Sequence, residues 1–163
     1  MTKPAVVLDA LDIKLLAQIQ DDAAQSSARL GAKIGLSATA VQRRLRRLKN
    51  GKVIGSTVMV VNPEAVDLGV TTIVSISMQS ESAASLKAFQ KNMLGCREVA
   101  QCYYTAGSAD FIVIASFTDI ATYEKFASQY FSANKHVRRY STQIVLQTIK
   151  RSLTVSLPDD QRR

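Results

Sequence analysis

Hydrophobic residues in the first fifty positions recur every three or four residues, which is the spacing of amphipathic helices. Asp9 is an expected N-cap of the first helix, with Asp12 in the first turn, where the helix dipole favours an acid. Ser26 or Ser27 is the expected cap of a second, shorter helix, which ends at Gly35. The apolar positions of these two helices are Leu8, Leu11, Leu15, Leu16, Ile19, Leu30 and Ile34.

A third helix is predicted over residues 37–50, because no residue there breaks a helix and the apolar positions form one narrow stripe. Ser37 is its expected N-cap, and Gly51 is available for a left-handed C-cap. The stripe consists of Val41, Leu45 and Leu48. Helix, helix, tight turn, helix is the order of a helix-turn-helix, and the alternative is an ordinary three-helix bundle.

The side of the third helix opposite the apolar stripe is positively charged throughout. Six Lys and Arg residues and no acid lie between Ser37 and Lys52. A solvated helix face normally mixes both signs, since opposite charges four residues apart stabilise a helix and like charges repel. One apolar side and one positive side suit the major groove of double-stranded DNA. We expect base contacts from Ser37, Ala38, Thr39, Gln42 and Arg43, and mostly phosphate contacts from Arg44, Arg46, Arg47 and Lys49.

The distribution of charge along the chain agrees with a basic arm joined to a near-neutral module. The net charge of the 163 residues is +8. Residues 1–61 contain ten Lys or Arg and four Asp or Glu, whereas residues 62–163 contain eleven and nine. Most of the excess positive charge therefore lies in the N-terminal third, as expected for a segment that binds nucleic acid.

Strand patterns replace the helical spacing after residue 52. The expected elements are strands over residues 53–61, 71–79, 97–105, 110–117 and 137–149, and helices over 82–94 and from 118 or 119 to 130 or 131. The last six elements follow the order β-α-β-β-α-β, which is the ferredoxin-like arrangement. Helices then cover one face of the sheet only, so we expect a second copy to cover the other face and to form at least a dimer.

These patterns divide an α+β chain into three parts. Residues 1–52 are predicted to form the helix-turn-helix domain. Residues 53–69 are a strand-containing linker, in which Pro63 begins a short helical piece that ends at Gly69. Residues 70–163 are the ferredoxin-like domain, the predicted effector-binding and oligomerisation part.

Motifs of catalysis and cofactor binding are missing from the sequence. It contains no Gly-rich phosphate loop, no Gly-x-Ser-x-Gly elbow and no His/Glu metal pair. Cys96, Cys102 and the only histidine, His136, have no spacing of a disulfide scaffold or a zinc site, and both thiols are expected to be small core residues. We therefore expect no enzymatic activity, cofactor or metal. RNA binding through the sheet is disfavoured, because Tyr103 and Tyr104 are neighbours in a strand and point to opposite faces.

The turn at residues 105–110 is the expected small-molecule site. Gly107 lets the backbone bend and a ligand approach closely. Its N–H groups can hold a carboxylate and Asp110 can receive an ammonium group, so the turn could bind an amino acid. The alternative is a hairpin in which the aspartate bonds only its own backbone. The candidate effector-binding residues are Tyr104, Thr105, Ala106, Gly107, Ser108 and Asp110.

Hydropathy along the chain predicts a cytoplasmic protein. No stretch reaches the roughly eighteen apolar residues of a membrane span. The start, Met1-Thr2-Lys3-Pro4, is followed by no long apolar run and does not resemble a signal peptide.

The spacing of residues over both modules resembles the leucine-responsive regulatory protein/asparagine-synthase regulator (Lrp/AsnC) family. The matching positions are Leu8-Asp9-x-x-Asp12-x-x-Leu15-Leu16-x-x-Ile19, Gly35-Leu36-Ser37-x-x-x-Val41-x-x-Arg44-x-x-Arg47-Leu48, Val53-Ile54, Leu68-Gly69, Gly107-x-x-Asp110-Phe111 and Thr142-x-Ile144-Val145-Leu146. The resemblance implies a sequence-specific DNA-binding transcriptional regulator that controls amino-acid metabolism or transport in response to a small effector such as an amino acid. It also implies homodimers that assemble further, commonly into octamers, with effectors near Gly107 and Asp110 at contacts between dimers.

The sequence departs from the pattern of this family at four places. Ala24 stands where an Arg is usual, Lys49 replaces a common Glu, and Gly51-Lys52 puts the glycine one place early. Lys49 makes the third helix more basic. Ala106 replaces the usual Thr or Ser before the turn glycine and removes a hydroxyl that an effector could contact.

A second interpretation belongs to another class of protein. The sheet domain could be a ligand-sensing module or a metabolic enzyme whose basic helical arm binds a protein partner. Retardation of DNA in a gel distinguishes the two, because only the regulator requires it.

Overall fold

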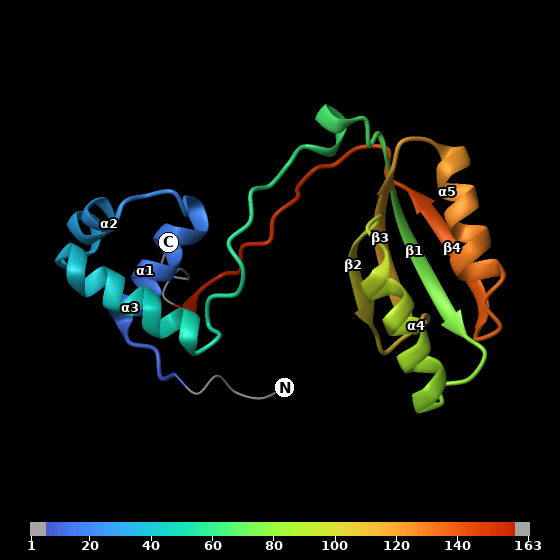
Figure 1. The fold of residues 1–163 in the computed structure, drawn as a ribbon, viewed down its shortest axis with the longest axis horizontal. Helices are drawn as coiled ribbons and strands as arrows, with labels where there is room; N and C mark the ends of the chain where they lie inside the picture. Colours follow the sequence, from blue (N-terminus) through green and yellow to red (C-terminus); the bar gives the residue numbers. More distant parts are fainter. Residues whose placement is uncertain (1–5, 159–163) are drawn as a thin grey trace. The chain divides into compact units, whose positions relative to one another are not determined.

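The computed structural model describes residues 6–158, which form two compact units (Figure 1). A helical unit contains residues 6–59 together with 151–158, and a sheet unit contains residues 60–150. Residues 1–5, on which the expectation about a signal peptide rests, lie outside the described range. Within that range no helix has both the length and the apolar character needed to cross a membrane.

The helical unit consists of three helices with the predicted caps. They are α1 (Ala10–Asp21), α2 (Ser27–Ile34) and α3 (Ala38–Asn50). Asp9 and Asp12 form a reciprocal capping box, while the side chains of Ser26 and Ser37 accept from the first turns of α2 and α3. Leu15, Leu16, Leu30, Val41 and Leu48 form the buried centre. The helix-turn-helix arrangement predicted from the sequence is therefore confirmed.

The turn between α2 and α3 depends on two glycines. Gly35 adopts the left-handed conformation with φ of 74° and caps α2, as predicted. Gly31 lies inside α2, where an added Cβ would overlap the carbonyl oxygen of Leu36. The N–H of Leu36 donates to the carbonyl of Gly31 at 2.9 Å. The absence of a side chain at Gly31 thus allows the chain to return closely over the end of α2.

The end of α3 differs from the prediction. Gly51 has φ of −79° and is not left-handed, and Lys52 takes the left-handed conformation instead, with φ of 56°. An added Cβ at Gly51 would overlap the side chain of Val6. Gly51 therefore leaves space for packing, and the reversal occurs one residue later.

The predicted strand over residues 53–61 is wrong. This segment has no strand pairing in the described chain, and Val58, Met59, Val60 and Val61 are all exposed. Its β-branched residues favour an extended backbone, but a strand also needs a hydrogen-bonding neighbour. The β propensity of residues 53–61 therefore produces an extended segment that pairs with no other strand of the described chain.

The C-terminal segment also departs from the predicted domain boundaries. Residues 151–158 belong with the helical unit and not with the sheet unit, although the predicted ferredoxin-like domain ran to residue 163. Gln20 of α1 exchanges two hydrogen bonds with the backbone of Val155, at 2.9 and 3.2 Å. Leu157 packs against the core of the helical unit. Residues 159–163 lie outside the described range.

The sheet unit has the predicted β-α-β-β-α-β order after a short 3₁₀ helix, η1 (Pro63–Val66). Its elements are β1 (Val70–Met78), α4 (Ala83–Gly95), β2 (Val99–Tyr104), β3 (Phe111–Phe117), α5 (Ile120–Ala127), the π-helical turn η2 (Ser128–Ser132) and β4 (Val137–Ile144). The strands are antiparallel in the order β2-β3-β1-β4, so β3 and β1 are the central strands. The last strand ends at Ile144 and not at residue 149.

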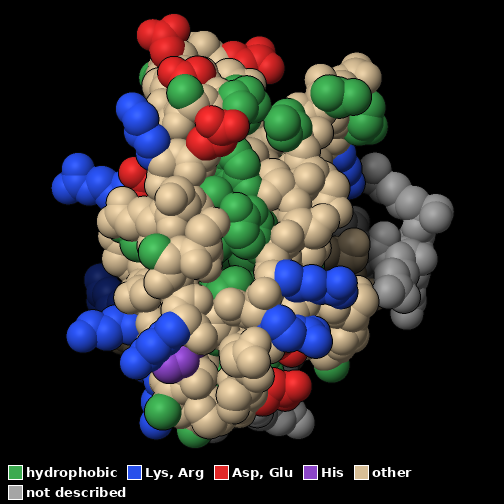
Figure 2. Space-filling view, turned by 90° about the vertical axis from the view of Figure 1, so that its right-hand side faces the viewer, with side chains coloured by type: hydrophobic (Ala, Val, Ile, Leu, Met, Phe, Trp, Pro, Cys, Tyr) green, Lys and Arg blue, Asp and Glu red, His purple; other side chains and the backbone are tan. Residues whose placement is uncertain are grey.

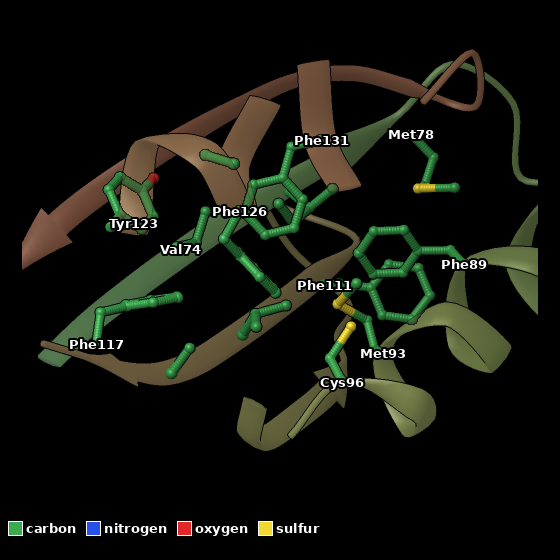
Figure 3. Close-up of a cluster of buried hydrophobic side chains, with 14 residues drawn as sticks. Val74, Met78, Phe89, Met93, Cys96, Phe111, Phe117, Tyr123, Phe126 and Phe131 are labelled. Atoms are coloured by element: carbon green, nitrogen blue, oxygen red, sulfur yellow. The ribbon is translucent and has the colours of Figure 1, made fainter. Parts of the chain in front are cut away.

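The core of this unit lies between the helices and one face of the sheet (Figures 1 and 3). Alternate residues of β3 are buried, from Phe111 to Phe117, and contact aromatic residues of the helices such as Phe89 and Phe126. On the opposite face Ile73, Ile112 and Ile114 remain partly exposed. The sheet thus has one covered face and one open apolar face within a single chain.

Candidate nucleic-acid interface and ligand pocket

The positive face of α3 is exposed over most of its length. Among the nine residues predicted to contact DNA, Ala38 and Arg44 are half-buried and the others are exposed: Ser37, Thr39, Gln42, Arg43, Arg46, Arg47 and Lys49. They come together because α3 is an unbroken helix whose opposite side packs Val41 and Leu48 into the core. The exposed set contains donors and cations suited to base edges and phosphates.

Two of the arginines contact acids of α1. Arg44 places Nη1 2.7 Å from Oδ2 of Asp9 and 2.8 Å from Oδ1 of Asp12. Arg47 pairs with the other carboxylate oxygen of Asp12. The side chain of Asp12 is fully buried, whereas those of Arg44 and Arg47 are 20% and 44% exposed. This cluster of Asp9, Asp12, Arg44 and Arg47 links the first turn of α1 to the middle of α3.

The cluster holds both carboxylates in the charged form. The hydrogen bond from Arg44 lowers the pKa of Asp9, helped by the backbone N–H of Asp12. Burial works to raise the pKa of Asp12, but the N–H of Asp9 and the two guanidinium groups outweigh it and lower that pKa. The same pairing raises the pKa of Arg44, with the hydrogen bond to Asp9 the largest cause.

Arg44 and Arg47 have a structural role that the sequence did not predict. Their pairs with Asp9 and Asp12 balance their charges and hold α1 against α3. The remaining cations between Ser37 and Lys52 are Arg43, Arg46, Lys49 and Lys52, which have no ion pair among residues 6–158. The uncompensated charge of this stretch is therefore +4, compared with +6 in the sequence.

The turn between β2 and β3 is closed by its own hydrogen bonds. The N–H of Thr105 donates to the carbonyl of Asp110 at 2.9 Å, and the Thr105 hydroxyl donates to the carbonyl of Ala109 at 2.6 Å. Gly107 has φ of 155°, which a residue with a side chain rarely adopts. The carboxylate of Asp110 accepts from the N–H of Met78 in β1 at 2.6 Å. Asp110 thus connects the turn to the end of a neighbouring strand and does not bond only within its own turn.

A hollow of about 360 Å³ opens beside this turn. Gly107, Ser108 and Asp110 line it, whereas the other three candidate effector residues, Tyr104, Thr105 and Ala106, do not. The remaining lining residues come from the end of β1, from the chain that follows it and from β4: Ser77, Met78, Gln79, Ser80, Glu81 and Arg138. Sequence reasoning missed this second group because it lies far from the turn in sequence and carries no local motif.

The tyrosines at the end of β2 do not line this hollow, although the hydroxyl of Tyr104 lies 3.5 Å from Glu81 on its wall. Tyr104 packs its ring 5.1 Å from that of Phe111 and borders a second hollow of about 370 Å³ between α4 and β2. Tyr103 pairs with Ile112 in the register and so belongs to the opposite face, as expected. Cys96 is buried as predicted, but Cys102 is exposed, because β2 is an edge strand that α4 covers only in part.

Comparison with known proteins agrees with both parts of this description. Residues 8–49 match the AsnC-type helix-turn-helix domain, and residues 71–155 match the Lrp/AsnC ligand binding domain. The uncharacterized HTH-type transcriptional regulator y4tD of Sinorhizobium fredii is 37% identical over 94% of this chain and 90% of its own length. The glutamate uptake regulatory protein of Zymomonas mobilis is 32% identical over 93% of this chain and 92% of its own.

A solved structure shows the same fold at comparable identity. The crystal structure of an AsnC family transcriptional regulator from Agrobacterium tumefaciens superposes with a TM-score of 0.85 at 30% identity, covering 91% of this chain and 97% of that one. Three findings lead to one conclusion: a basic helix-turn-helix, a ferredoxin-like sheet with a hollow at the predicted turn, and relatives that match along nearly their whole length. The chain belongs to the Lrp/AsnC family of DNA-binding transcriptional regulators.

Proposed function

We propose that α3 enters the major groove, with Ser37, Ala38, Thr39, Gln42 and Arg43 toward the bases and with Arg46 and Lys49 toward the phosphates. The supporting observation is that the cations along α3 differ in their partners. Arg44 and Arg47 are neutralised by Asp9 and Asp12, whereas Arg43, Arg46 and Lys49 are exposed without an acidic neighbour among the described residues. An uncompensated cation next to a phosphate releases counterions, which supplies binding free energy.

The regulated processes are proposed to be amino-acid metabolism or transport, with a small effector such as an amino acid bound beside Gly107, Ser108 and Asp110. The hollow at this turn supports this assignment, as does the carboxylate of Asp110 on its wall, one oxygen of which accepts from the Met78 N–H. The relative from Zymomonas mobilis, named as a glutamate uptake regulator, supports the class of process. The proposal includes no enzymatic step, and it places the protein in the cytoplasm, where its DNA lies.

The working form is proposed to be a homodimer that assembles into higher oligomers such as octamers. The open apolar face of the sheet, with Ile73, Ile112 and Ile114, supports pairing through that surface. A dimer presents two copies of α3 and so suits a pseudo-palindromic operator.

A gel-shift assay on the protein's own upstream region, with and without a panel of amino acids, tests the function. Retardation that one amino acid changes is the expected result. Asp110→Asn should abolish the response to the amino acid and preserve retardation, because asparagine keeps an acceptor for the Met78 N–H but loses the charge. Asp67→Asn, at an exposed left-handed position that asparagine tolerates, is the matched control. Absence of retardation at low salt would favour the alternative, a ligand-sensing module or enzyme whose basic arm binds a protein.

A further inference from the structure

The hollow beside the β2–β3 turn has an unequal number of acids and bases on its wall. Glu81 and Asp110 contribute two carboxylates, whereas Arg138 contributes the single guanidinium. The other side chains of the lining are polar apart from Gly107, which has none, and Met78, a residue that is 5% exposed and belongs to the core. The wall therefore carries a net charge of −1 and offers almost no apolar surface to a ligand.

These charges are not balanced by neighbours. The three ion pairs found among residues 6–158 all lie in the helical unit, so none joins Glu81, Asp110 or Arg138. One oxygen of Asp110 accepts from the Met78 N–H, and the other oxygen accepts no hydrogen bond from residues 6–158. Glu81 has only a long contact, 3.5 Å from the hydroxyl of Tyr104. A ligand can therefore approach both acids without breaking an ion pair.

A β-bulge places Arg138 at this wall. Ser77 of β1 pairs with Arg139 of β4, and Met78 pairs with Val137, so Arg138 has no partner across the ladder. An extra residue of this kind redirects its side chain out of the regular alternation, and such bulges often lie next to binding sites. In Figure 2, Lys and Arg side chains gather toward the lower end of the sheet unit, the end at which β1 finishes and β4 begins.

We propose that the effector bound here is a basic amino acid, such as lysine, arginine or ornithine. This inference rests on the proposed effector site and names its ligand class. The guanidinium of Arg138 holds the α-carboxylate in a bidentate pair, Asp110 holds the α-ammonium group, and Glu81 holds the side-chain cation. Two cationic groups and one carboxylate on the ligand match two carboxylates and one guanidinium on the wall.

Other amino acids fit this wall less well. An acidic side chain would bring a second carboxylate toward Glu81 and Asp110, and like charges brought together in an interface are repelled. An apolar side chain would desolvate Gln79 and the serines at positions 77, 80 and 108 without replacing their hydrogen bonds to water. The hollow of about 360 Å³ is small enough to favour a single amino acid over a larger metabolite.

Isothermal titration of the full chain with L-lysine, L-arginine, L-glutamine, L-leucine and L-glutamate tests the inference. We expect one of the two basic amino acids to bind at least about tenfold more tightly than the other three. Glu81→Gln should remove the preference for lysine over glutamine, while Glu124→Gln on the exposed face of α5 should keep it. Arg138→Gln should weaken all of these ligands about tenfold or more, whereas Arg139→Gln, in the next position of the same strand, should not.

The possible failures are distinguishable from one another. Tighter binding of a neutral or acidic amino acid that Asp110→Asn abolishes would overturn the ligand class and leave the effector site standing. If Glu81→Gln, with its fold verified by circular dichroism, still preferred lysine over glutamine, the proposed ligand class would also be overturned. If none of the five amino acids binds while the protein retards DNA, the effector assignment and this inference fail together and the DNA-binding function stands.

Discussion

At the scale of single residues, the buried and charged side chain of Asp12 joins α1 to α3. It accepts from the N–H of Asp9 and from Arg44 and Arg47, so both of its oxygens are used. A buried carboxylate is stable only when such partners replace its water. The sequence shows Asp12 as a helix-dipole residue in the first turn of α1, and only the packing of α3 reveals its larger role.

Replacing this charge should destabilise the helical unit. Asp12→Asn keeps the shape of the side chain but leaves Arg47 without a counter-charge and Arg44 with Asp9 alone. We expect the free energy of unfolding to fall by about 2 kcal/mol in a urea titration followed by circular dichroism. Asp21→Asn, at the exposed end of the same helix, should change it by less than about 0.5 kcal/mol. Equal effects of the two changes would contradict a structural role for the cluster.

The same carboxylates predict how stability depends on pH. The pKa values of Asp9 and Asp12 are lower in the folded chain than the ordinary value of 3.8. Folding is therefore favoured while both groups are charged above pH 3.8, and this contribution is lost as the pH falls toward the lowered pKa values. Thermal unfolding at a series of pH values from 7 to about 2 should show a steeper loss for the wild type than for Asp12→Asn.

The exposed arginines of α3 should behave differently from the paired ones. Alanine at Arg43 or Arg46 should weaken DNA binding several-fold without loss of stability. Where the arginine contacts a phosphate, the slope of log K against the logarithm of the salt concentration should also become shallower by about one. Arg97→Ala, an exposed arginine of the sheet unit, is the control and should leave binding unchanged. Arg44→Ala should lower stability first, because it removes a partner of buried Asp12. Filter binding at several salt concentrations, alongside melting temperatures, separates these effects.

At the scale of elements, the turn between α2 and α3 sets the orientation of the reading helix. Gly31→Ala would drive a methyl group into the carbonyl of Leu36, so α2 and α3 would have to separate. We expect a loss of about 1–3 kcal/mol in unfolding free energy and weaker DNA binding. Gly55→Ala, where an added Cβ meets nothing within 4 Å, is the matched control. Retention of full stability in Gly31→Ala would show that the turn tolerates a side chain.

The elements also show where local sequence is sufficient. Asp9, Ser26 and Ser37 cap their helices as expected, since a cap depends only on residues within one turn. The segment over 53–61 has the composition of a strand and forms none, because pairing needs a partner that local sequence does not supply. The left-handed position of Lys52, one residue beyond the expected glycine, is likewise not indicated by the local sequence.

At the scale of the whole molecule, the open sheet face is the surface on which assembly depends. Ile73 lies on this face opposite Ile114 in the register and is 36% exposed. Ile73→Lys should shift the oligomer toward monomer, since a buried unpaired ammonium is costly at an apolar interface. Ile120→Lys, at an isoleucine of similar exposure that begins α5, should leave the assembly intact. Multi-angle light scattering coupled to gel filtration measures both, and unchanged mass in Ile73→Lys would place the contact elsewhere.

Sequence alone determined the element order, the helix N-caps, the ferredoxin-like topology and the basic character of α3, because each follows from residues close together in the chain. Tertiary structure decided which charges remain available: it paired Arg44 and Arg47 with Asp9 and Asp12, and it brought Glu81 and Arg138 to Asp110. It also returned residues 151–158 to α1 through Gln20. The physical reason is that these ion pairs and this pocket join groups far apart in the chain, and no spacing pattern along the sequence records which of them meet.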